Sequence, residues 1–336
     1  PAQISDWNQH VFQFPEYSIF HSQQWADVLR HTYRYEPQYL ADLEGSNQNL
    51  IIPLCNVKSI LTGKRGVSLP FSDFCPSLES GNKDIDVLQE LKDFGKESNW
   101  DYFELRGNAR FTDHIQPSMS YVGHMLDLTR SIDLTYQNFR PTTRRNIDKA
   151  RRKKIEVHFV DDTNSVKEFY RLNCLTRRRH GLPPQPAKFF ENIYQHLIKS
   201  GLGYVVLASY QKQTVAGLLV LTFGKRAIYK FGASESQYRN TNANYTLIWE
   251  VIKKCAEDKI ESLHFGRTHP AATGLIQFKK SWGCIQHPIH YFRYSFKKKD
   301  FIKTRSQESG IYNHVFRILN IKMLKLIGQA LYRHLG

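Results

Sequence analysis

Apolar residues recur at helical or strand spacing along the chain, and the elements they predict form two series. The first series opens with a helix over residues 18–35, where Trp25, Val28 and Leu29 share one face and Ser22 can cap the first turn. Residues 1–17 show no such pattern and are expected to be irregular. The rest of the series is predicted as strands at 39–43, 50–55 (after a turn at 44–49), 66–70 and 100–105, with a helix at 85–98 before the last strand.

The same order of elements returns in the second half of the chain. We expect a helix at 189–198, a hairpin of 204–209 and 216–223, a strand at 227–232, a helix at 245–258 and strands at 260–265 and 290–296. Gly-Lys-Arg introduces equivalent strands at 63–65 and 224–226, and DYFELRG (101–107) and ESLHFGR (261–267) end equivalent helix–strand units. This recurrence indicates a tandem duplication, although two α/β units that merely look alike would leave a similar trace.

The segment between the two series, residues 139–154, is strongly basic. Pro141 followed by Thr142 and Thr143 predicts the start of a helix there. A run of charge on a helix is usually a solvated face, and the alternative is a phosphate-binding rim for RNA or a pyrophosphate-linked acceptor. The cluster Arg177-Arg178-Arg179-His180 leaves the same two interpretations open. We place a first domain at residues 1–140 and a second at 141–296, with 297–336 as a C-terminal extension.

Composition narrows the class of protein and its partners. A chain of 336 residues can bury a large core and favours two domains, and 41% hydrophobic content excludes a disordered chain. The net charge of +16 points to anionic partners such as RNA, phosphorylated precursors, nucleotides or an anionic membrane face. Five widely spread cysteines imply no disulfide framework, and no apolar run reaches the ~18 residues of a spanning helix. We therefore expect a cytoplasmic protein, with the inner face of the plasma membrane as a further location that the sequence allows.

The most informative stretch is residues 264–283, HFGRTHPAATGLIQFKKSWG. The strand predicted before it breaks at Gly266, where the absence of a Cβ permits a sharp turn. Arg267 and Lys279 then place two cations at the end of a strand, where α/β proteins tend to bind ligands. This pattern is typical of a site for an anion, or for a group that becomes negative during a reaction.

FGRT…TG…FKKSWG resembles the signature of the Fem-type (FemAB-like) acyltransferases of the GNAT superfamily, which carry FGRS, Gly-Thr-Gly and FKxxWG. That family includes the peptidoglycan-bridge aminoacyltransferases and related bacterial acyltransferases. The similarity extends to residues 20–29, 69–74 and 228–259. It implies a mixed α/β (α+β) fold of two tandem GNAT-like domains, each a mixed central sheet flanked by helices.

The resemblance also implies transfer of an acyl or aminoacyl group to an amine of a cell-envelope acceptor, such as a peptidoglycan precursor or a polysaccharide. It assigns Lys279 to the oxyanion, Phe278 to the acyl channel, Arg267 to a phosphate or carboxylate, and Trp282 with Gly283 to the loop that holds the substrate. The alternative for Lys279 is a surface lysine on a strand. The remaining catalytic candidate is an acid, Asp73 in the segment LPFSDF. Its alternative role is to cap a turn.

The acyl donor is expected to bind after the strand that contains Tyr229. GNAT proteins grip the pyrophosphate of coenzyme A with a Gly-rich loop, and this chain reads QYRNTNAN at the equivalent place, 237–244. Arg239 matches the family's arginine, but Asn242 and Asn244 replace glycines; asparagine tolerates positive φ, yet its side chain narrows the approach. The donor is therefore left open between acyl-coenzyme A and aminoacyl-tRNA, with no tightly bound cofactor expected.

Other types of site are not supported by the sequence. HExxH, GxSxG, Walker and CxxC motifs are all missing. Cys284, His287 and His290 have metal-like spacing, but Pro288 lies among them and no fourth ligand is evident, so no metal is expected.

The C-terminal extension begins with a basic linker, 297–305, and continues with a basic amphipathic helix predicted over 311–335. Such a helix lies on an anionic membrane or docks on the first domain, and the sequence favours neither. A non-catalytic RNA- or membrane-binding protein on a transferase scaffold is the alternative to an enzyme.

Overall fold

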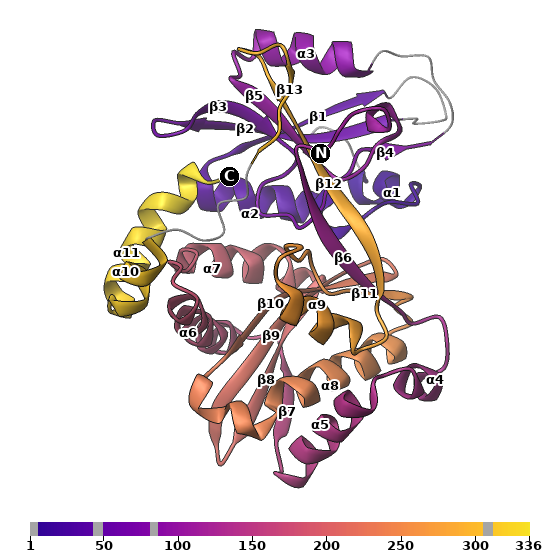
Figure 1. The fold of residues 1–336 in the computed structure, drawn as a ribbon, viewed down its shortest axis with the longest axis vertical. Coiled ribbons are helices and arrows are strands. Elements are labelled where there is room, and N and C mark those ends of the chain that lie inside the picture. Colours follow the sequence, from indigo (N-terminus) through magenta and orange to yellow (C-terminus); the bar gives the residue numbers. More distant parts are fainter. Residues whose placement is uncertain (1–5, 43–49, 81–86, 305–311) are drawn as a thin grey trace. The chain divides into compact units, whose positions relative to one another are not determined.

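The computed structural model describes residues 6–42, 50–80, 87–304 and 312–336. The chain divides into two compact units, which are described separately (Figure 1). The first unit comprises residues 1–121, 288–308 and 330–336, and the second comprises 122–287 and 309–329. The turn predicted at 44–49, and the ends of the predicted helices at Ile85 and Ile311, lie outside the described residues.

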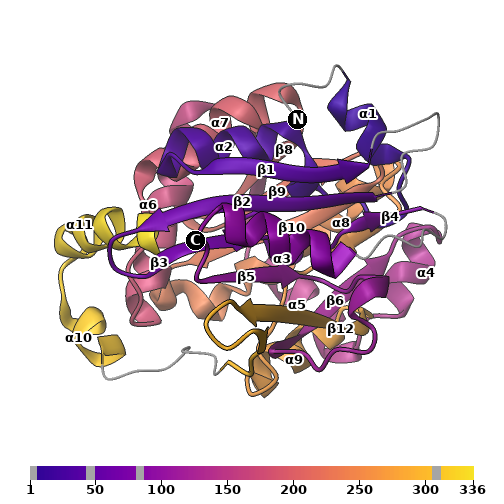
Figure 2. The ribbon, with the colours of Figure 1, turned by 90° about the horizontal axis from the view of Figure 1, so that it is seen from above.

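The first unit is built on a mixed sheet of strand order β1-β2-β3-β5-β12, whose neighbouring strands β1, β2, β3 and β5 are visible in Figure 2. Neighbouring strands are antiparallel except β3 and β5, which are parallel and joined through α3. Two short strands pair at the margins, β4 with β2 and β13 with β12. The bounds are α1 (Trp7–Phe12), α2 (Gln23–Tyr33), β1 (Glu36–Asp42), β2 (Leu50–Ser59), β3 (Gly63–Val67), β4 (Leu78–Glu79), α3 (Val87–Glu97), β5 (Tyr102–Arg106), β12 (Ile285–Ser295) and β13 (Asp300–Phe301).

Helix α2 begins as its sequence predicts, because the Ser22 side chain accepts a hydrogen bond from the Trp25 N–H. The expectation that residues 1–17 are irregular is wrong. Helix α1 forms there, and Trp7 and Val11, one helical turn apart, are buried. The Trp7 Nε1–H donates to the His21 carbonyl at 2.8 Å, which fixes this short helix to the chain ahead of α2.

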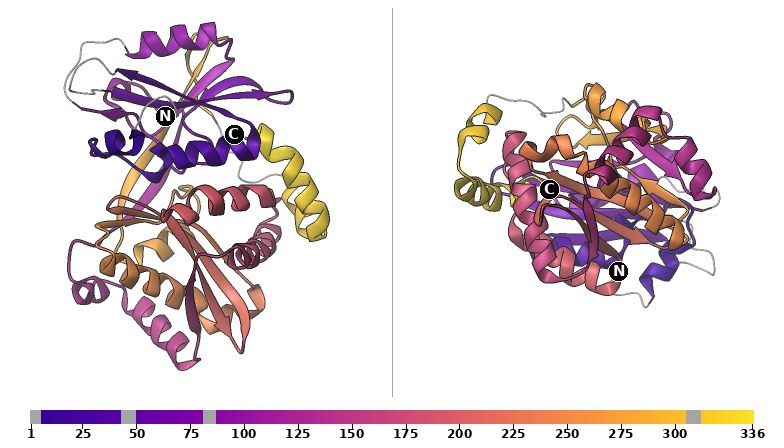
Figure 3. Two further views of the ribbon diagram at one scale, coloured as in Figure 1. Left: turned by 180° about the vertical axis from the view of Figure 1, so that it is seen from behind. Right: turned by 90° about the horizontal axis from the view of Figure 1, so that it is seen from below.

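The second unit has the strand order β6-β11-β10-β9-β8-β7, again antiparallel except for one parallel pair, β10 and β11, joined through α8. Helices cover both faces of this sheet, α6 and α7 on one and α5 and α8 on the other (Figure 3). The bounds are β6 (Met119–Asp127), α4 (Ile132–Gln137), α5 (Pro141–Arg152), β7 (Glu156–Val160), α6 (Thr163–Arg179), α7 (Ala187–His196), β8 (Gly203–Tyr210), β9 (Gln213–Phe223), β10 (Arg226–Ser234), α8 (Ala243–Glu257), β11 (Ser262–His264), α9 (Thr273–Lys280), α10 (Tyr312–Ile318) and α11 (Ile321–Leu331).

The predicted recurrence is present in the topology. Each unit has three antiparallel strands followed by a helix and a parallel strand, β1-β2-β3-α3-β5 in the first and β8-β9-β10-α8-β11 in the second. The strand that completes each sheet comes from elsewhere in the chain, since β12 pairs with β5 and β6 pairs with β11. For this reason the compact units change over at 121/122 and 287/288, whereas the sequence places the domain boundary at 140/141.

The C-terminal extension is two helices rather than the single predicted one. Asn320 separates α10 from α11, and its side chain accepts from the Met323 N–H at 2.9 Å. Residues 330–336, which include the last two residues of α11, belong to the first unit, where buried Arg65 donates to the Gly336 oxygen at 2.8 Å and to the His334 carbonyl at 2.7 Å. Helix α10 and α11 up to Gln329 belong to the second unit, whereas the docking alternative places the predicted helix on the first domain.

Candidate active site

The parallel strands β10 and β11 separate soon after they pair. Their register runs only from Arg226↔Ser262 to Ile228↔His264, and β10 then bulges between Tyr229 and Phe231. The chain after β11 follows β6 instead, since the Phe265 N–H donates to the His124 carbonyl at 2.8 Å. Ligands of α/β proteins bind at the carboxyl ends of strands where neighbouring connections diverge, so this is the place to look for the reaction centre.

Tyr229 stands at the point of separation. Its ring lies 6.0 Å from that of Phe265, and a Cβ on Gly232 would come within 1.8 Å of its hydroxyl oxygen. Burial raises the pKa of the Tyr229 hydroxyl, which therefore stays protonated at neutral pH. A substrate contact of Tyr229 stays a prediction.

Gly266 makes the sharp turn that the sequence predicts. Its φ is +70°, in the left-handed region where glycine is favoured, and its N–H donates to His264 Nδ1 at 2.9 Å. Thr268 returns the chain to β6, because its N–H donates to the Val122 carbonyl at 2.8 Å. Arg267 lies between Gly266 and Thr268 and is half-buried, and its role as an anion anchor stays a prediction.

Lys279 lies on helix α9 and is 6% exposed, so the alternative of a surface lysine on a strand is wrong. Its Nζ donates to the Gly266 carbonyl at 3.0 Å and to Thr268 Oγ1 at 2.8 Å. Both of these acceptors are neutral, so they position the ammonium without neutralising its charge. A cation is thus held at the turn that follows β11.

An aromatic cluster lies next to this lysine: Phe278 precedes it in the chain, Trp282 follows it, and Tyr245 of α8 contacts both rings. The Tyr245 ring lies 5.7 Å from Phe278 and 5.8 Å from Trp282. Trp282 is completely buried and packs in the core, and its assignment to the substrate loop stays a prediction. Gly283 has φ +75° and ends the turn after α9, and Phe278 is half-buried.

The predicted donor loop forms between β10 and α8. Asn242 has φ +59° and ψ +23°, so the asparagine adopts the left-handed conformation for which the family uses glycine. The loop is closed by Thr241, whose hydroxyl accepts from the Ala243 N–H at 3.3 Å, and it is tied to α5 by Lys153, whose Nζ donates to the Asn240 carbonyl at 2.7 Å.

A cavity of about 360 Å³ opens at this loop. It is lined by Arg239, Asn242 and Asn244 of the expected donor loop, and also by Arg179 and Tyr245. Their contact with the donor stays a prediction. Burial lowers the pKa of Arg179, and the positive charge of Arg239 lowers it further. Two guanidinium groups that repel each other in a cavity favour an anion between them.

A second cavity of about 420 Å³ continues the first. The two share Arg179, Ser234, Glu235 and Ser236, and the second adds Arg178 and Arg317. The carboxylate of Glu235 forms an ion pair with Arg171 at 2.6 Å. Its charge is therefore already balanced by Arg171 rather than by Arg179. The charged side chains of the two linings are four arginines and this one glutamate, a balance that suits a ligand with more than one phosphate.

Residues 137–280 match the family described as the acetyltransferase (GNAT) domain. The match lies in the second half of the chain and includes the residues of the site described above. This match confirms the expected class of enzyme, an acyltransferase. A search of the curated proteins found no match to the chain.

Solved structures with the same fold extend the comparison beyond the GNAT domain. FemX superposes with a TM-score of 0.69 at 15% identity, covering 87% of this chain and 96% of FemX. L-PGS from Bacillus licheniformis gives 0.57 at 11% identity, with 94% and 95% covered. The C-terminal domain of a predicted lysylphosphatidylglycerol synthetase from Agrobacterium fabrum gives 0.54 at 11%, with 80% and 86% covered. The predicted Fem-type fold is confirmed.

Several residues of the GNAT domain site could not be assigned from the sequence. The sequence leaves the interpretation of Arg178 and Arg179 open between a solvated face and a phosphate rim, and the structure places Arg179 in both cavities and Arg178 in the second. Tyr245 lines the first cavity and contacts Phe278, and the sequence offers no role for it beyond its position directly after the donor loop. Asp73 belongs to the first unit, where its carbonyl accepts from the Tyr291 hydroxyl at 2.8 Å; its catalytic role stays a prediction.

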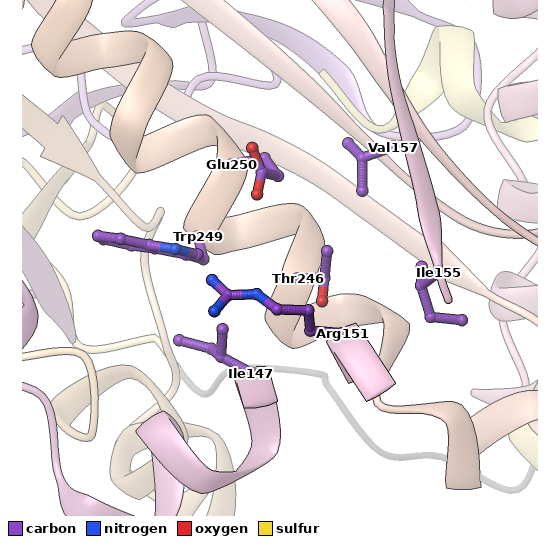
Figure 4. Close-up of a pocket in the computed structure, with 7 residues that line it drawn as sticks. All are labelled: Ile147, Arg151, Ile155, Val157, Thr246, Trp249 and Glu250. Atoms are coloured by element: carbon purple, nitrogen blue, oxygen red, sulfur yellow. The ribbon is translucent and has the colours of Figure 1, made fainter. Parts of the chain in front are cut away.

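The basic segment 139–154 is mostly solvated, as its simpler interpretation predicts. Helix α5 buries Thr143, Ile147 and Ala150 and exposes most of its cations. A separate hollow of about 210 Å³ lies between α5, β7 and α8, where Arg151 extends across toward Trp249 (Figure 4). None of the predicted site residues lines it, so it is distinct from the donor cavity.

Three histidines, His124, His264 and His287, interact with one another through contacts or charge, and His124 is also influenced by the charge of Lys279. His264 Nε2 lies 3.4 Å from His287 Nε2, and His124 Nε2 lies 3.2 Å from the Gln286 amide nitrogen. Burial, Lys279 and His287 together lower the pKa of His124 to about 4. Neutral His124 therefore accepts from the Gln286 amide at Nε2. Within the described part of the chain, no three His, Cys, Asp or Glu side chains are grouped to hold a metal ion.

We expect the protein to lose stability as the pH falls from about 7 to 4, because His124 binds a proton in the unfolded chain near its ordinary pKa but in the folded protein only near 4. The loss attributable to this residue is on the order of 3 kcal/mol. Urea unfolding at several pH values measures it. A His124→Gln variant with the same pH slope as the wild type would contradict the assignment.

Proposed function

We propose that the protein transfers an acyl or aminoacyl group from a phosphate-bearing carrier to an amine of a cell-envelope precursor or polysaccharide. The observation that supports this most strongly is the continuity of the site. The cationic cavity at Arg179 and Arg239 reaches Tyr245, Tyr245 contacts Phe278, and the next residue is the buried Lys279 at the turn after β11. Carrier phosphates and a reacting carbonyl would thus occupy neighbouring parts of one domain.

The chemistry follows from this arrangement. A neutral amine attacks the carbonyl carbon of the carrier ester or thioester, forming a C–N bond and a tetrahedral oxyanion. The Lys279 ammonium stabilises that charge, and the C–O or C–S bond to the carrier then breaks. The amine proton leaves with the carrier oxygen or sulfur, so the step needs no other reactant.

The GNAT domain supports acyl-coenzyme A as the donor, and the Fem-type fold supports aminoacyl-tRNA. Both carriers present phosphates to the same arginines. The acceptor is proposed from the fold shared with FemX and with the predicted lysylphosphatidylglycerol synthetase, which suggests the cell envelope as the place of action.

The donor site is tested by binding. We expect Arg239→Ala and Arg179→Ala to weaken binding of the true donor by ten-fold or more, because each removes a charged partner of phosphate. Isothermal titration with acetyl-coenzyme A and with charged tRNA measures this, and Arg130→Ala, outside the cavities, is the matched control. If neither donor binds, or if both variants bind as the wild type does, the proposed site is wrong.

A further inference from the structure

Helices α10 and α11 of the second unit expose large apolar side chains. The exposed fractions are 49% for Val315, 85% for Ile318, 47% for Met323 and 67% for Leu326. Each helix contributes two of them at a spacing of three residues, which places the pair on one face. Four such side chains on two consecutive helices are more than the isolated apolar residue that any surface carries.

The opposite face of these helices is already packed. Leu324 is fully buried, and Gly328 lies so close to Pro184 that a Cβ would come within 2.0 Å of its carbonyl oxygen. The Lys325 ammonium lies 4.9 Å from the centre of the Tyr170 ring, on α6. Helices α10 and α11 are therefore held on the second unit without their outward apolar residues.

The outward face is also positively charged. Arg317 and Lys322 are exposed beside the apolar residues, and residues 312–336 contain no Asp or Glu. Apolar side chains flanked by cations match the acyl and headgroup layers of an anionic bilayer. An RNA backbone would leave Ile318 and Leu326 in water, which makes it the poorer fit.

We propose that Val315, Ile318, Met323 and Leu326 form a docking surface for an anionic phospholipid membrane, with α10 and α11 lying in its interface. The helices are already formed, so no ordering of a disordered segment opposes binding. No helix in the described part of the chain is long and apolar enough to cross a membrane. The four apolar residues of the surface lie outside the donor cavities, although the neighbouring Arg317 also lines the second one. Docking there would bring the proposed acyl transfer to lipid-linked acceptors.

Vesicle flotation with the full chain, in the absence of donor and acceptor, tests the proposal. We expect binding to vesicles of equal phosphatidylglycerol and phosphatidylcholine, and at least ten-fold weaker binding to phosphatidylcholine alone or in 0.5 M NaCl. The double variant Ile318→Ser/Leu326→Ser should bind the anionic vesicles at least ten-fold more weakly than the wild type.

The matched control removes exposed apolar residues elsewhere. Ile60 and Leu61, 98% and 67% exposed in the first unit, are replaced by serine and should leave vesicle binding unchanged. Circular dichroism melting confirms that both variants fold. Equal binding by the wild type and the α10–α11 variant, or loss in the control variant alone, would overturn the proposal. A concentration-dependent dimer that the α10–α11 variant abolishes, without vesicle binding, would assign the surface to a second copy.

Discussion

Lys279→Ala is expected to lower kcat for acyl transfer by about 10² to 10³-fold, since the variant lacks the ammonium that meets the oxyanion. Donor affinity should change little, because the arginines of the donor cavity are untouched. The change also leaves the Gly266 carbonyl and Thr268 Oγ1 without this donor, which costs about 1–3 kcal/mol of folding free energy. Single-turnover rates at saturating donor separate the chemical step from binding.

Lys280→Ala is the matched control for this experiment. Lys280 is the next residue of the same helix α9, but it is exposed, so its loss should alter kcat less than three-fold. Lys279→Met keeps the stem of the side chain and removes only the charge, and its melting temperature shows whether lost activity reflects unfolding. A folded Lys279→Met variant with the kcat of Lys280→Ala would remove Lys279 from the reaction.

Much of the fold was predictable because it depends on local chemistry. Local signals determine where several elements begin. Examples are Ser22 at the start of α2, Pro141 at the start of α5 and the recurrence of Gly-Lys-Arg beside equivalent strands. The predicted β8–β9 hairpin forms with its turn at Gln211 and Lys212, which both have positive φ, one residue before the expected Lys212-Gln213.

The missed elements depend on distant partners or on polar core positions. Strand β6 pairs with β11, more than a hundred residues later in the chain, and nothing in the sequence of β6 indicates which strand it pairs with. Helix α6 was missed because Asn173 and Thr176 occupy buried positions and interrupt its apolar stripe. The burial of Lys279 depends on the Gly266 carbonyl, a backbone group that every residue carries and no motif reveals.

The largest stability effect is expected in the first unit, at Glu104. This carboxylate on β5 is 4% exposed, and it accepts from Arg106 Nε at 2.9 Å and from Arg293 Nε at 3.0 Å, the latter on β12. Burial alone would raise its pKa, but the two guanidinium groups outweigh burial and hold the pKa below the ordinary value. The stabilisation is therefore present above pH 4 to 5 and is lost as the pH falls through the folded-state pKa.

Glu104→Gln keeps the shape of the side chain and removes the charge that both arginines share. Breaking a buried ion pair at one partner costs about 3–5 kcal/mol, because the remaining charges, here on two partly buried arginines, lose their compensation. The matched control is Glu261→Gln. The Glu261 carboxylate pairs with Lys225 at 2.6 Å, but both side chains are at least half exposed, so this substitution should cost no more than about 1 kcal/mol. Urea unfolding of both variants at pH 7 compares them directly. Similar small losses for the two would mean that solvent screens Glu104 as fully as it does a surface carboxylate, and that β5 and β12 are held by their ladder and aromatic core instead.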